Sequence, residues 1–261
     1  MYDLPEDLIV EAEGPLRIVT FNRPADRNPA STAMLFGLTK LARALAADES
    51  VSAVVLTGAG KAFSAGGDFQ HFIKTATDPV VARETLDNGR EFIKAMLDLP
   101  VPVIAAVNGA AVGFGATIAA LSDIVLMADT AFFAEPHINV GLVVGDGISI
   151  TWPFLLAMNK AKELIFTGDR IYAADAVACG LANRAVPLDQ LMPEALALAH
   201  RIAQQPHSAL CGSKQIMNMY SKAMMESVLE ATLAKQYDQI QGADHGRIVQ
   251  QLIDKQQRNQ S

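Results

Sequence analysis

The chain has 261 residues and a mass of 27.8 kDa, which suffices for one large domain or for a domain with an appendage. Because 51% of the residues are apolar and only 19% are charged, a sizeable core can be buried. The net charge of −7 argues against a nucleic-acid partner, whose phosphates would be repelled. The two cysteines, Cys179 and Cys211, lack the spacing of a zinc site or a disulfide framework, so no metal is predicted.

The composition also predicts a soluble, cytoplasmic protein without membrane association. Residues 1–7 are acidic and show neither the positive region nor the apolar region of a secretion signal. The longest apolar stretch, 101–121, contains Asn108 and several glycines. That spacing is typical of a strand–loop–helix unit rather than of a membrane span.

Taken in chain order, the first elements predict a sheet with helices. The β-rich runs 8–13 and 16–21 are separated by Gly14 and Pro15, which indicates a hairpin. Helical and strand-like patterns then alternate up to residue 133: helix 31–47 with Ser31 as its cap, strand 51–57, helix 82–97, strand 103–107, helix 113–121 and strands 124–127 and 131–133. This alternation predicts an α/β fold with mostly parallel strand pairing.

After Pro187 the pattern becomes wholly helical. Helices are expected over 188–204, 208–223, 226–240 and 245–257, where they would pack on their own core or on a neighbouring subunit. We therefore divide the chain into a core, 1–190, and a C-terminal helical region, 191–261. Four methionines in this region are expected to serve helix packing: Met217, Met219, Met224 and Met225.

Two glycine-rich turns carry the chemistry of the sequence. Residues 61–69 follow the strand 51–57, and residues 108–116 follow the strand 103–107 and open a helix. Each turn places unpaired backbone N–H groups where a helix dipole favours negative charge. Two such groups on one oxygen would form an oxyanion hole. Neither turn has the spacing of a dinucleotide-binding or phosphate-cradling loop.

Several motifs occur together in a specific order: Asn22-Arg-Pro24, Leu56-Thr-Gly58, Phe63-Ser-Ala-Gly-Gly-Asp68, Pro102-Val-Ile-Ala-Ala-Val-Asn-Gly109 and Leu164-Ile-Phe-Thr-Gly-Asp169. With this set the chain resembles the enoyl-CoA hydratase/isomerase (crotonase) family over nearly its whole length. The resemblance implies a repeated ββα spiral core, a C-terminal helical region used in trimerisation, and a homotrimer or a hexamer. It also implies an acyl-CoA substrate, with coenzyme A entering as part of that substrate and no separate cofactor.

The resemblance assigns roles to individual positions. Gly67 and Phe114 are expected to donate the oxyanion-hole N–H groups, with the Phe114 ring shaping the acyl pocket. Substrate binding is expected at Asp26, Arg27, Ala65, Thr117 and Lys255, the last of which is expected to reach the coenzyme A phosphates.

The chain departs from the hydratases at both catalytic glutamates, where it has Thr117 and His137. Loss of a general acid or base typically lowers a rate by about 10²–10⁴-fold, which argues against ordinary enoyl-CoA hydration. Asp146 lies in the loop after His137 and is expected to fix the tautomer of a neutral, proton-transferring imidazole. Alternatively, the histidine is structural and Asp146 caps the helix that begins near Gly147. Glu135 is a weaker acid–base candidate.

Three functions remain open. The first is proton transfer on an acyl-CoA through a stabilised enolate, with His137 and Asp146 as catalytic residues. The second is C–C bond hydrolysis, because the Pro-His, Gly-Asp-Gly and Trp-Pro elements after residue 135 resemble the crotonase-fold β-diketone hydrolases. The third is non-catalytic acyl-CoA binding. We expect Asp68 to hold its loop, and His71 and His207 to lie on the surface.

Overall fold

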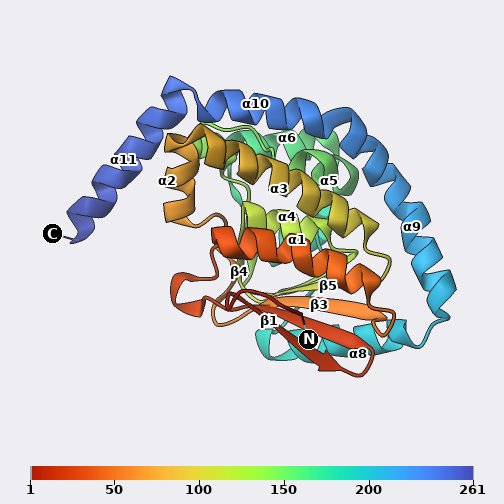
Figure 1. Cartoon of the computed structure of the whole chain (residues 1–261). Helices are drawn as coiled ribbons and strands as arrows, with labels where there is room; N and C mark the ends of the chain where they lie inside the picture. Colours follow the sequence, from red (N-terminus) through yellow and green to blue (C-terminus); the bar gives the residue numbers. More distant parts are fainter. Residues whose placement is uncertain (1, 261) are drawn as a thin grey trace.

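The computed structural model describes residues 2–260, and its largest element is a six-stranded sheet (Figure 1). The strands stand in the order β1 (Leu8–Glu13), β2 (Leu16–Phe21), β3 (Ala53–Gly58), β5 (Val103–Val107), β7 (Ile124–Ala128) and β10 (Arg184–Val186). β1 and β2 form the expected antiparallel hairpin, and all other neighbours pair in parallel. The predicted α/β class with mostly parallel pairing is therefore confirmed.

A second sheet of short strands was not predicted. It consists of β4 (Ala62–Ser64), β6 (Ala110–Val112), β8 (Phe132–Ala134) and β9 (Arg170–Tyr172). β4, β6 and β8 each follow one strand of the large sheet, namely β3, β5 and β7. The chain thus repeats a unit of a long strand, a short strand and a helix. A strand of three residues is too short to show an alternating pattern. The sequence therefore did not reveal β4 in the first glycine-rich turn or β6 in the second.

Helices cover both faces of the large sheet (Figure 1). α1 (Thr32–Ala47) packs against α3 (Pro79–Asp98) on one face, where α4 (Phe114–Leu121) also lies. α8 (Leu188–Ala203) packs against the strands on the other face. α3 begins earlier than expected, because Asp78 caps it and Pro79 fits its first turn. The proposed division at residue 190 falls within α8, whose apolar side joins the core.

The remaining helices of the core region are α2 (Phe69–Thr77), α5 (Ile148–Leu155), α6 (Met158–Thr167) and α7 (Ala173–Cys179), with short 3₁₀ turns η1 (Pro24–Asp26) and η2 (His137–Val140). Most of the large buried side chains belong to one continuous cluster between the large sheet and its helices. Within residues 2–260, no helix combines the length and apolar character needed to cross a bilayer.

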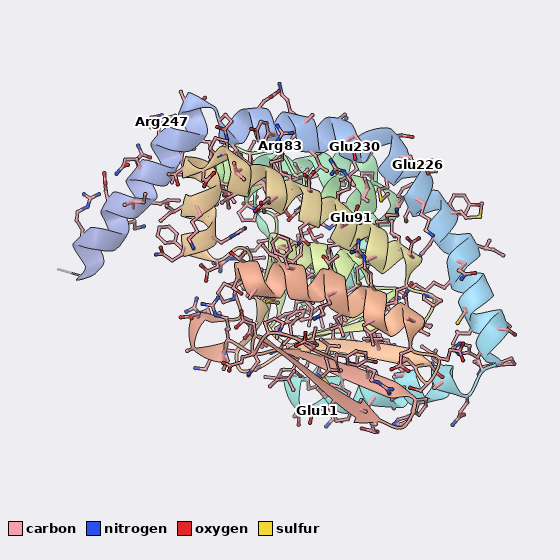
Figure 2. The ribbon with its side chains drawn as sticks, viewed as in Figure 1. Glu11, Arg83, Glu91, Glu226, Glu230 and Arg247 are labelled. Carbon is pink, nitrogen blue, oxygen red and sulfur yellow. The ribbon has the colours of Figure 1, made fainter. Side chains whose placement is uncertain are left out.

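The C-terminal helices form an arc around the core (Figure 1). They are α9 (His207–Met224), the π-helical turn η3 (Met225–Leu229), α10 (Glu230–Ile240) and α11 (Ala243–Gln260). Two contacts tie α10 to α3: the Arg83 guanidinium lies 4.7 Å from the centroid of the Tyr237 ring, and Arg90 pairs with Glu230. Figure 2 labels Arg83 on α3 and Glu230 on α10, one residue of each contact. The arc therefore closes over the side of the molecule that α2 and α3 form.

The methionines of this region divide into two groups. Met224 and Met225 pack against the core, as expected. Met217 and Met219 are 66% and 65% exposed, so the prediction that they pack is wrong within the single chain. Helical spacing shows that residues share a face but not that another part of the same chain covers that face.

Candidate active site

The first glycine-rich turn is held by the segment that precedes α1. Ala65 N–H donates to the Arg27 carbonyl at 2.9 Å, and Ala30 N–H donates to the Gly66 carbonyl at 2.7 Å. Gly66 has a φ of +95°, a conformation that favours glycine. Between these contacts, the Gly67 N–H has no acceptor in the described part of the chain. The turn therefore presents a free backbone donor.

Asp68, the next residue, holds this turn in place. Its carboxylate accepts hydrogen bonds from Gln70 N–H at 2.9 Å and His71 N–H at 3.3 Å, so it caps α2. It also pairs with Arg23 at 2.7 Å, which helps to lower its pKa although burial opposes that shift. The predicted loop-holding role of Asp68 is confirmed.

The second turn presents a similar donor. Gly113, with a φ of +50°, donates its N–H to the Ala134 carbonyl at 2.9 Å and precedes α4. Phe114 is the first residue of α4, and its N–H has no acceptor among residues 2–260. The N-terminus of a helix carries positive partial charge, so this group is suited to a developing anion. The Phe114 ring packs against Phe92 at 5.2 Å between centroids.

Close glycine contacts set the two turns side by side. A Cβ at Gly115 would lie 2.7 Å from the Ser64 carbonyl oxygen, and one at Gly66 would lie 2.9 Å from the Val112 carbonyl oxygen. Real Cβ atoms essentially never approach backbone so closely, so glycine permits this packing.

Both turns open into one cavity of about 350 Å³. Its walls are mostly apolar and come from α2, α3, α10 and the segment that follows β8. Among the predicted site residues, the cavity is lined by Ala65, Gly67, Phe114, His137 and Asp146. Main-chain donors and titratable side chains from distant segments therefore meet at one concave site.

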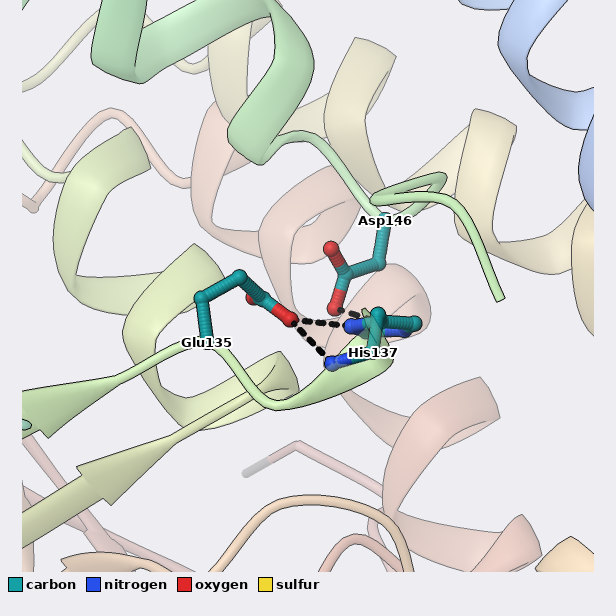
Figure 3. Close-up of side chains that lie close together, drawn as sticks. All are labelled: Glu135, His137 and Asp146. Carbon is teal, nitrogen blue, oxygen red and sulfur yellow. Dashed lines mark hydrogen bonds and ion pairs between the residues drawn. The ribbon is translucent and has the colours of Figure 1, made fainter. Parts of the chain in front are cut away.

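Three titratable side chains lie close together (Figure 3), and two of them, His137 and Asp146, line this cavity. Glu135 follows β8 and is fully buried, His137 begins η2, and Asp146 stands two residues before α5. Glu135 Oε1 contacts His137 Nδ1 and also accepts the His137 backbone N–H at 3.2 Å. Asp146 Oδ2 lies 3.9 Å from His137 Nε2. The imidazole is therefore flanked by a carboxylate at each ring nitrogen.

The charges of this cluster perturb its pKa values. Burial disfavours the charged imidazolium, but the carboxylates of Glu135 and then Asp146 outweigh burial and raise the pKa of His137 to about 9. Burial raises the pKa of Asp146 to about 6; the charge of His137 opposes this shift and that of Glu135 reinforces it. At neutral pH His137 is thus protonated and Asp146 is largely ionised, in contrast to the expected neutral histidine.

The structure corrects the expected partner of the histidine. Glu135, ranked below Asp146 from the sequence, contacts Nδ1 and fixes the ring, whereas Asp146 approaches Nε2. The sequence signal for Glu135 was its place two residues before His137 on an extended segment, where alternate side chains share a face. Asp146 does not cap α5 either, because Gly147 is the N-cap and makes no side-chain cap bond.

Several buried oxygens of the cluster have no hydrogen-bond partner among the described residues: Glu135 Oε2, Asp146 Oδ1 and Thr117 Oγ1. Thr117 is fully buried in α4, and its hydroxyl slightly lowers the pKa of Asp146 without a hydrogen bond of standard geometry. It therefore stands behind the cluster and does not line the cavity. Unpaired buried oxygens are costly, and they concentrate at functional sites.

The cluster also has donors for a metal ion, since single ligand atoms of Glu135, His137 and Asp146 lie within 4.8 Å of one another. A protonated imidazole has no lone pair to offer, so a cation would first have to displace the His137 proton. The raised pKa of His137 opposes that exchange at neutral pH.

Besides Thr117, three more predicted substrate-binding residues lie outside the cavity. Asp26 and Arg27 are exposed at the end of η1, where Asp26 pairs with Arg23 at 3.1 Å. Lys255 is exposed on α11, three residues after Leu252, which lines the cavity.

His71 was predicted to lie on the surface, and this is wrong. It is 7% exposed and lines the cavity from α2. Its Nδ1 lies 2.7 Å from Thr32 Oγ1 and its Nε2 lies 3.1 Å from Thr85 Oγ1, while burial lowers its pKa. The cap at Asp68 followed by Phe69 and Phe72 would have indicated α2, although not the direction of the histidine. His207 is exposed, as expected.

Comparisons with known proteins agree with this fold. Residues 11–259 match the family model described as enoyl-CoA hydratase/isomerase. A probable enoyl-CoA hydratase, echA8, of Mycobacterium leprae is 34% identical over 229 residues, which cover 86% of each chain. The human enoyl-CoA delta isomerase 2 is 31% identical over 227 residues, covering 85% of this chain and 57% of that protein. The crystal structure of an enoyl-CoA hydratase/isomerase from Mycobacterium paratuberculosis superposes with a TM-score of 0.93 at 40% identity, covering 96% of this chain and 100% of that one.

The repeated strand–strand–helix units and the helical C-terminal region are those of the crotonase superfamily. Within it, the chain belongs to the enoyl-CoA hydratase/isomerase family and is an enzyme of that family. The family resemblance inferred from the ordered sequence motifs is confirmed.

Proposed function

We propose that this enzyme transfers a proton at the α-carbon of an enoyl-CoA thioester and thereby shifts its double bond. The observation that carries the proposal is the meeting, in one cavity, of two unpaired main-chain N–H groups and the Glu135–His137–Asp146 cluster. The Gly67 and Phe114 N–H groups would receive the thioester oxygen as negative charge develops on it. Each such donor is typically worth about 2.7–4 kcal/mol of transition-state stabilisation.

In the proposed step, Asp146 takes the proton from carbon, and the electron pair of the broken C–H bond passes to the thioester oxygen as an enolate. Collapse of the enolate returns a proton to the carbon at the other end of the shifted double bond. A carboxylate whose pKa is raised to about 6 is a suitable base near neutral pH. The imidazolium of His137 stabilises the Asp146 carboxylate and supplies or relays the returning proton.

This reaction suits the residues better than ordinary hydration with two glutamates does. Thr117 is buried behind the cluster and has no carboxylate to activate a water molecule. A proton shift needs only one base with an acid beside it. One relative with 31% identity is named an enoyl-CoA delta isomerase, which supports the same reaction type.

The second candidate is C–C bond hydrolysis of a β-oxo substrate. It is favoured by the approach of Asp146 Oδ2 to His137 Nε2, because such a pair can activate water for attack on a carbonyl carbon. The two reactions differ in their products. Isomerisation leaves the mass of the substrate unchanged, whereas hydrolysis adds water and releases a new carboxylate.

Proton exchange provides the test. In D₂O the wild-type enzyme is expected to place deuterium at the α-carbon of hexanoyl-CoA, as detected by mass spectrometry. Asp146→Asn removes the base and should slow this exchange by about 10²–10⁴-fold. Asp129→Asn, at an exposed aspartate, is the matched control and should exchange at the wild-type rate.

Two outcomes would overturn the proposal. If Asp146→Asn exchanged deuterium at the wild-type rate, the base would be another residue. A panel of saturated and unsaturated acyl-CoAs should also be tested. If the protein bound them but neither exchanged their protons nor turned them over, a non-catalytic acyl-CoA binding protein would be supported instead.

We also propose that the enzyme assembles as a homotrimer or as a hexamer built from two trimers. The support is an exposed apolar face of α9, formed by Ile216, Met217, Met219 and Tyr220, each at least 64% exposed. Monomeric soluble proteins rarely leave such a patch uncovered.

A further inference from the structure

The segment from His137 to Asp146 carries both groups that would move protons. Its first four residues form η2, which Gly141 ends with a φ of +73°. The Leu142 N–H donates back to the His137 carbonyl at 2.9 Å, so the start of the turn is closed by the backbone itself. No further helix or strand lies between η2 and Asp146. The path of the chain after η2 therefore decides where the Asp146 carboxylate lies relative to the imidazole.

Two backbone groups at the end of this turn do not pair with each other. In a 3₁₀ helix each N–H donates to the carbonyl three residues earlier, so the Val143 N–H would continue η2 by donating to the Val140 carbonyl. Instead, the Val143 N–H donates to Gln239 Oε1 at 2.7 Å. The Val140 carbonyl oxygen lies 2.6 Å from His245 Nδ1, and no backbone N–H of the described residues donates to it. Side chains of the C-terminal arc thus take the place of both backbone partners.

His245 is built into the fold in the orientation that this bond needs. It lies in the first turn of α11, is 1% exposed, and packs edge-on against Phe72 with 5.2 Å between ring centroids. The backbone of α11 lies against the turn, since a Cβ at Gly141 would be 3.6 Å from His245 Cα. A carbonyl oxygen only accepts, so Nδ1 carries the hydrogen. Its Nε2 has no partner among residues 2–260, so the bond to Val140 is the polar contact that fixes the ring.

We infer that His245 and Gln239 are positioning residues that set the approach of Asp146 to the imidazole. The inference rests on the proposed function, since it takes Asp146 and His137 as the acid–base pair. Without the two side chains, the backbone groups that they satisfy would pair with each other and extend η2. That extension rewinds the chain before Asp146 and changes the 3.9 Å between its Oδ2 and His137 Nε2. A misplacement of about 1 Å can lower a rate by about 10²-fold.

The first test compares two substitutions of the same histidine. His245→Leu removes the donor but keeps an apolar side chain beside Phe72, and it should slow deuterium exchange into hexanoyl-CoA by about 10–100-fold. The asparagine amide nitrogen is as many bonds from the backbone as Nδ1, so His245→Asn should recover most of the rate. His207→Leu, at an exposed histidine, is the matched control and should exchange at the wild-type rate.

The outcomes separate the two proposals. A wild-type rate in His245→Leu would overturn the positioning role, and so would an equal loss in His245→Asn, because the donor would then not be what matters. Absence of exchange in the wild-type protein would instead overturn the proposed function.

The pH profile of exchange separates positioning from a merely structural role. The charge of Asp146 raises the pKa of His137, and the charge of His137 opposes the rise in the pKa of Asp146. Moving the two groups apart should therefore lower the histidine pKa and raise the carboxyl pKa. Because exchange needs an ionised Asp146 and a protonated His137, the profile of His245→Leu should narrow from both sides. Gln239→Met removes the other partner and should narrow it in the same way, so the test does not depend on one variant. A wild-type profile in both variants would refute the inference.

Discussion

His137 is held as a cation by its two neighbours, and this decides how the residue would act. A neutral imidazole would be a base, whereas an imidazolium between carboxylates is an acid and an electrostatic partner. Its pKa is raised to about 9 and that of Asp146 to about 6. Because the pKa of His137 is raised in the folded state, its charge interactions with the two carboxylates stabilise the fold. This contribution is fully present below about pH 6.5 and is lost as the pH rises through about 9. The raised Asp146 pKa acts in the opposite sense, because the destabilisation by the buried carboxylate develops as the pH rises from 3.8 to about 6 and is fully present at neutral pH.

The same pKa values predict the pH dependence of catalysis. Activity requires an ionised Asp146 and a protonated His137, so kcat/KM should rise with pH near 6 and fall near 9. Glu135→Gln removes the larger of the two charges that raise the histidine pKa, so the alkaline limb should move to lower pH. Glu163→Gln, at an exposed glutamate paired with Lys160, should leave the profile unchanged. An alkaline limb that stays in place in Glu135→Gln would mean that Glu135 does not hold the imidazolium.

At the scale of elements, the site depends on how the two glycine-rich turns are joined. Each turn belongs to a strand–strand–helix unit, and the pairing of β4 with β6 places the units next to each other. Gly115 in α4 then permits the close approach to Ser64. The separation of the Gly67 and Phe114 donors is thus set by backbone packing rather than by side chains.

Gly115→Ala should therefore damage both stability and activity. The added methyl would lie 2.7 Å from a backbone oxygen that has little room to move, and such overpacking typically costs about 1–3 kcal/mol. Urea unfolding should show that loss, and kcat/KM should fall because the turns are forced apart. Gly246→Ala, where nothing lies within 4 Å of the new Cβ, should be neutral or stabilising by up to about 1 kcal/mol. Equal stability of the two variants would contradict this account.

At the scale of the whole molecule, the C-terminal arc performs two tasks. α10 and α11 complete the cavity, since Leu233, Gln236, Ile240 and Leu252 form part of its wall. α9 does not line the cavity but packs on the core. Its buried Lys214 pairs with Asp123 at 2.6 Å and donates to the Val101 carbonyl at 2.8 Å. Its opposite, apolar face remains uncovered within the chain.

Self-association through α9 can be tested by sedimentation. The wild-type protein should sediment as a trimer or hexamer, and Met217→Glu should shift it toward smaller species, because a charge in an apolar contact is strongly unfavourable. Ser208→Glu, at an exposed position near the start of the same helix, should not change the assembly. A monomeric wild type would refute the proposed assembly.

Taken by itself, the sequence determined the elements with strong local signals. The hairpin of residues 8–21, the buried strands and the four C-terminal helical segments follow from alternation and helical spacing, which are local properties. The ordered motifs also indicated the family, and with it the candidate donors at Gly67 and Phe114. Of the second sheet, only β8 was predicted, as the run 131–133; β4, β6 and β9 escaped prediction, because they are defined by their partners rather than by their own pattern.

Only the tertiary structure decided what each polar group faces. His71 is buried because α2 turns it toward Thr32 and Thr85, and Glu135 contacts the imidazole because the chain turns tightly after β8. His245 reaches the Val140 carbonyl across 105 residues of sequence. Burial and the placement of charges depend on contacts between distant segments, so neither the charge state of His137 nor the bond from His245 to η2 could be read from local spacing.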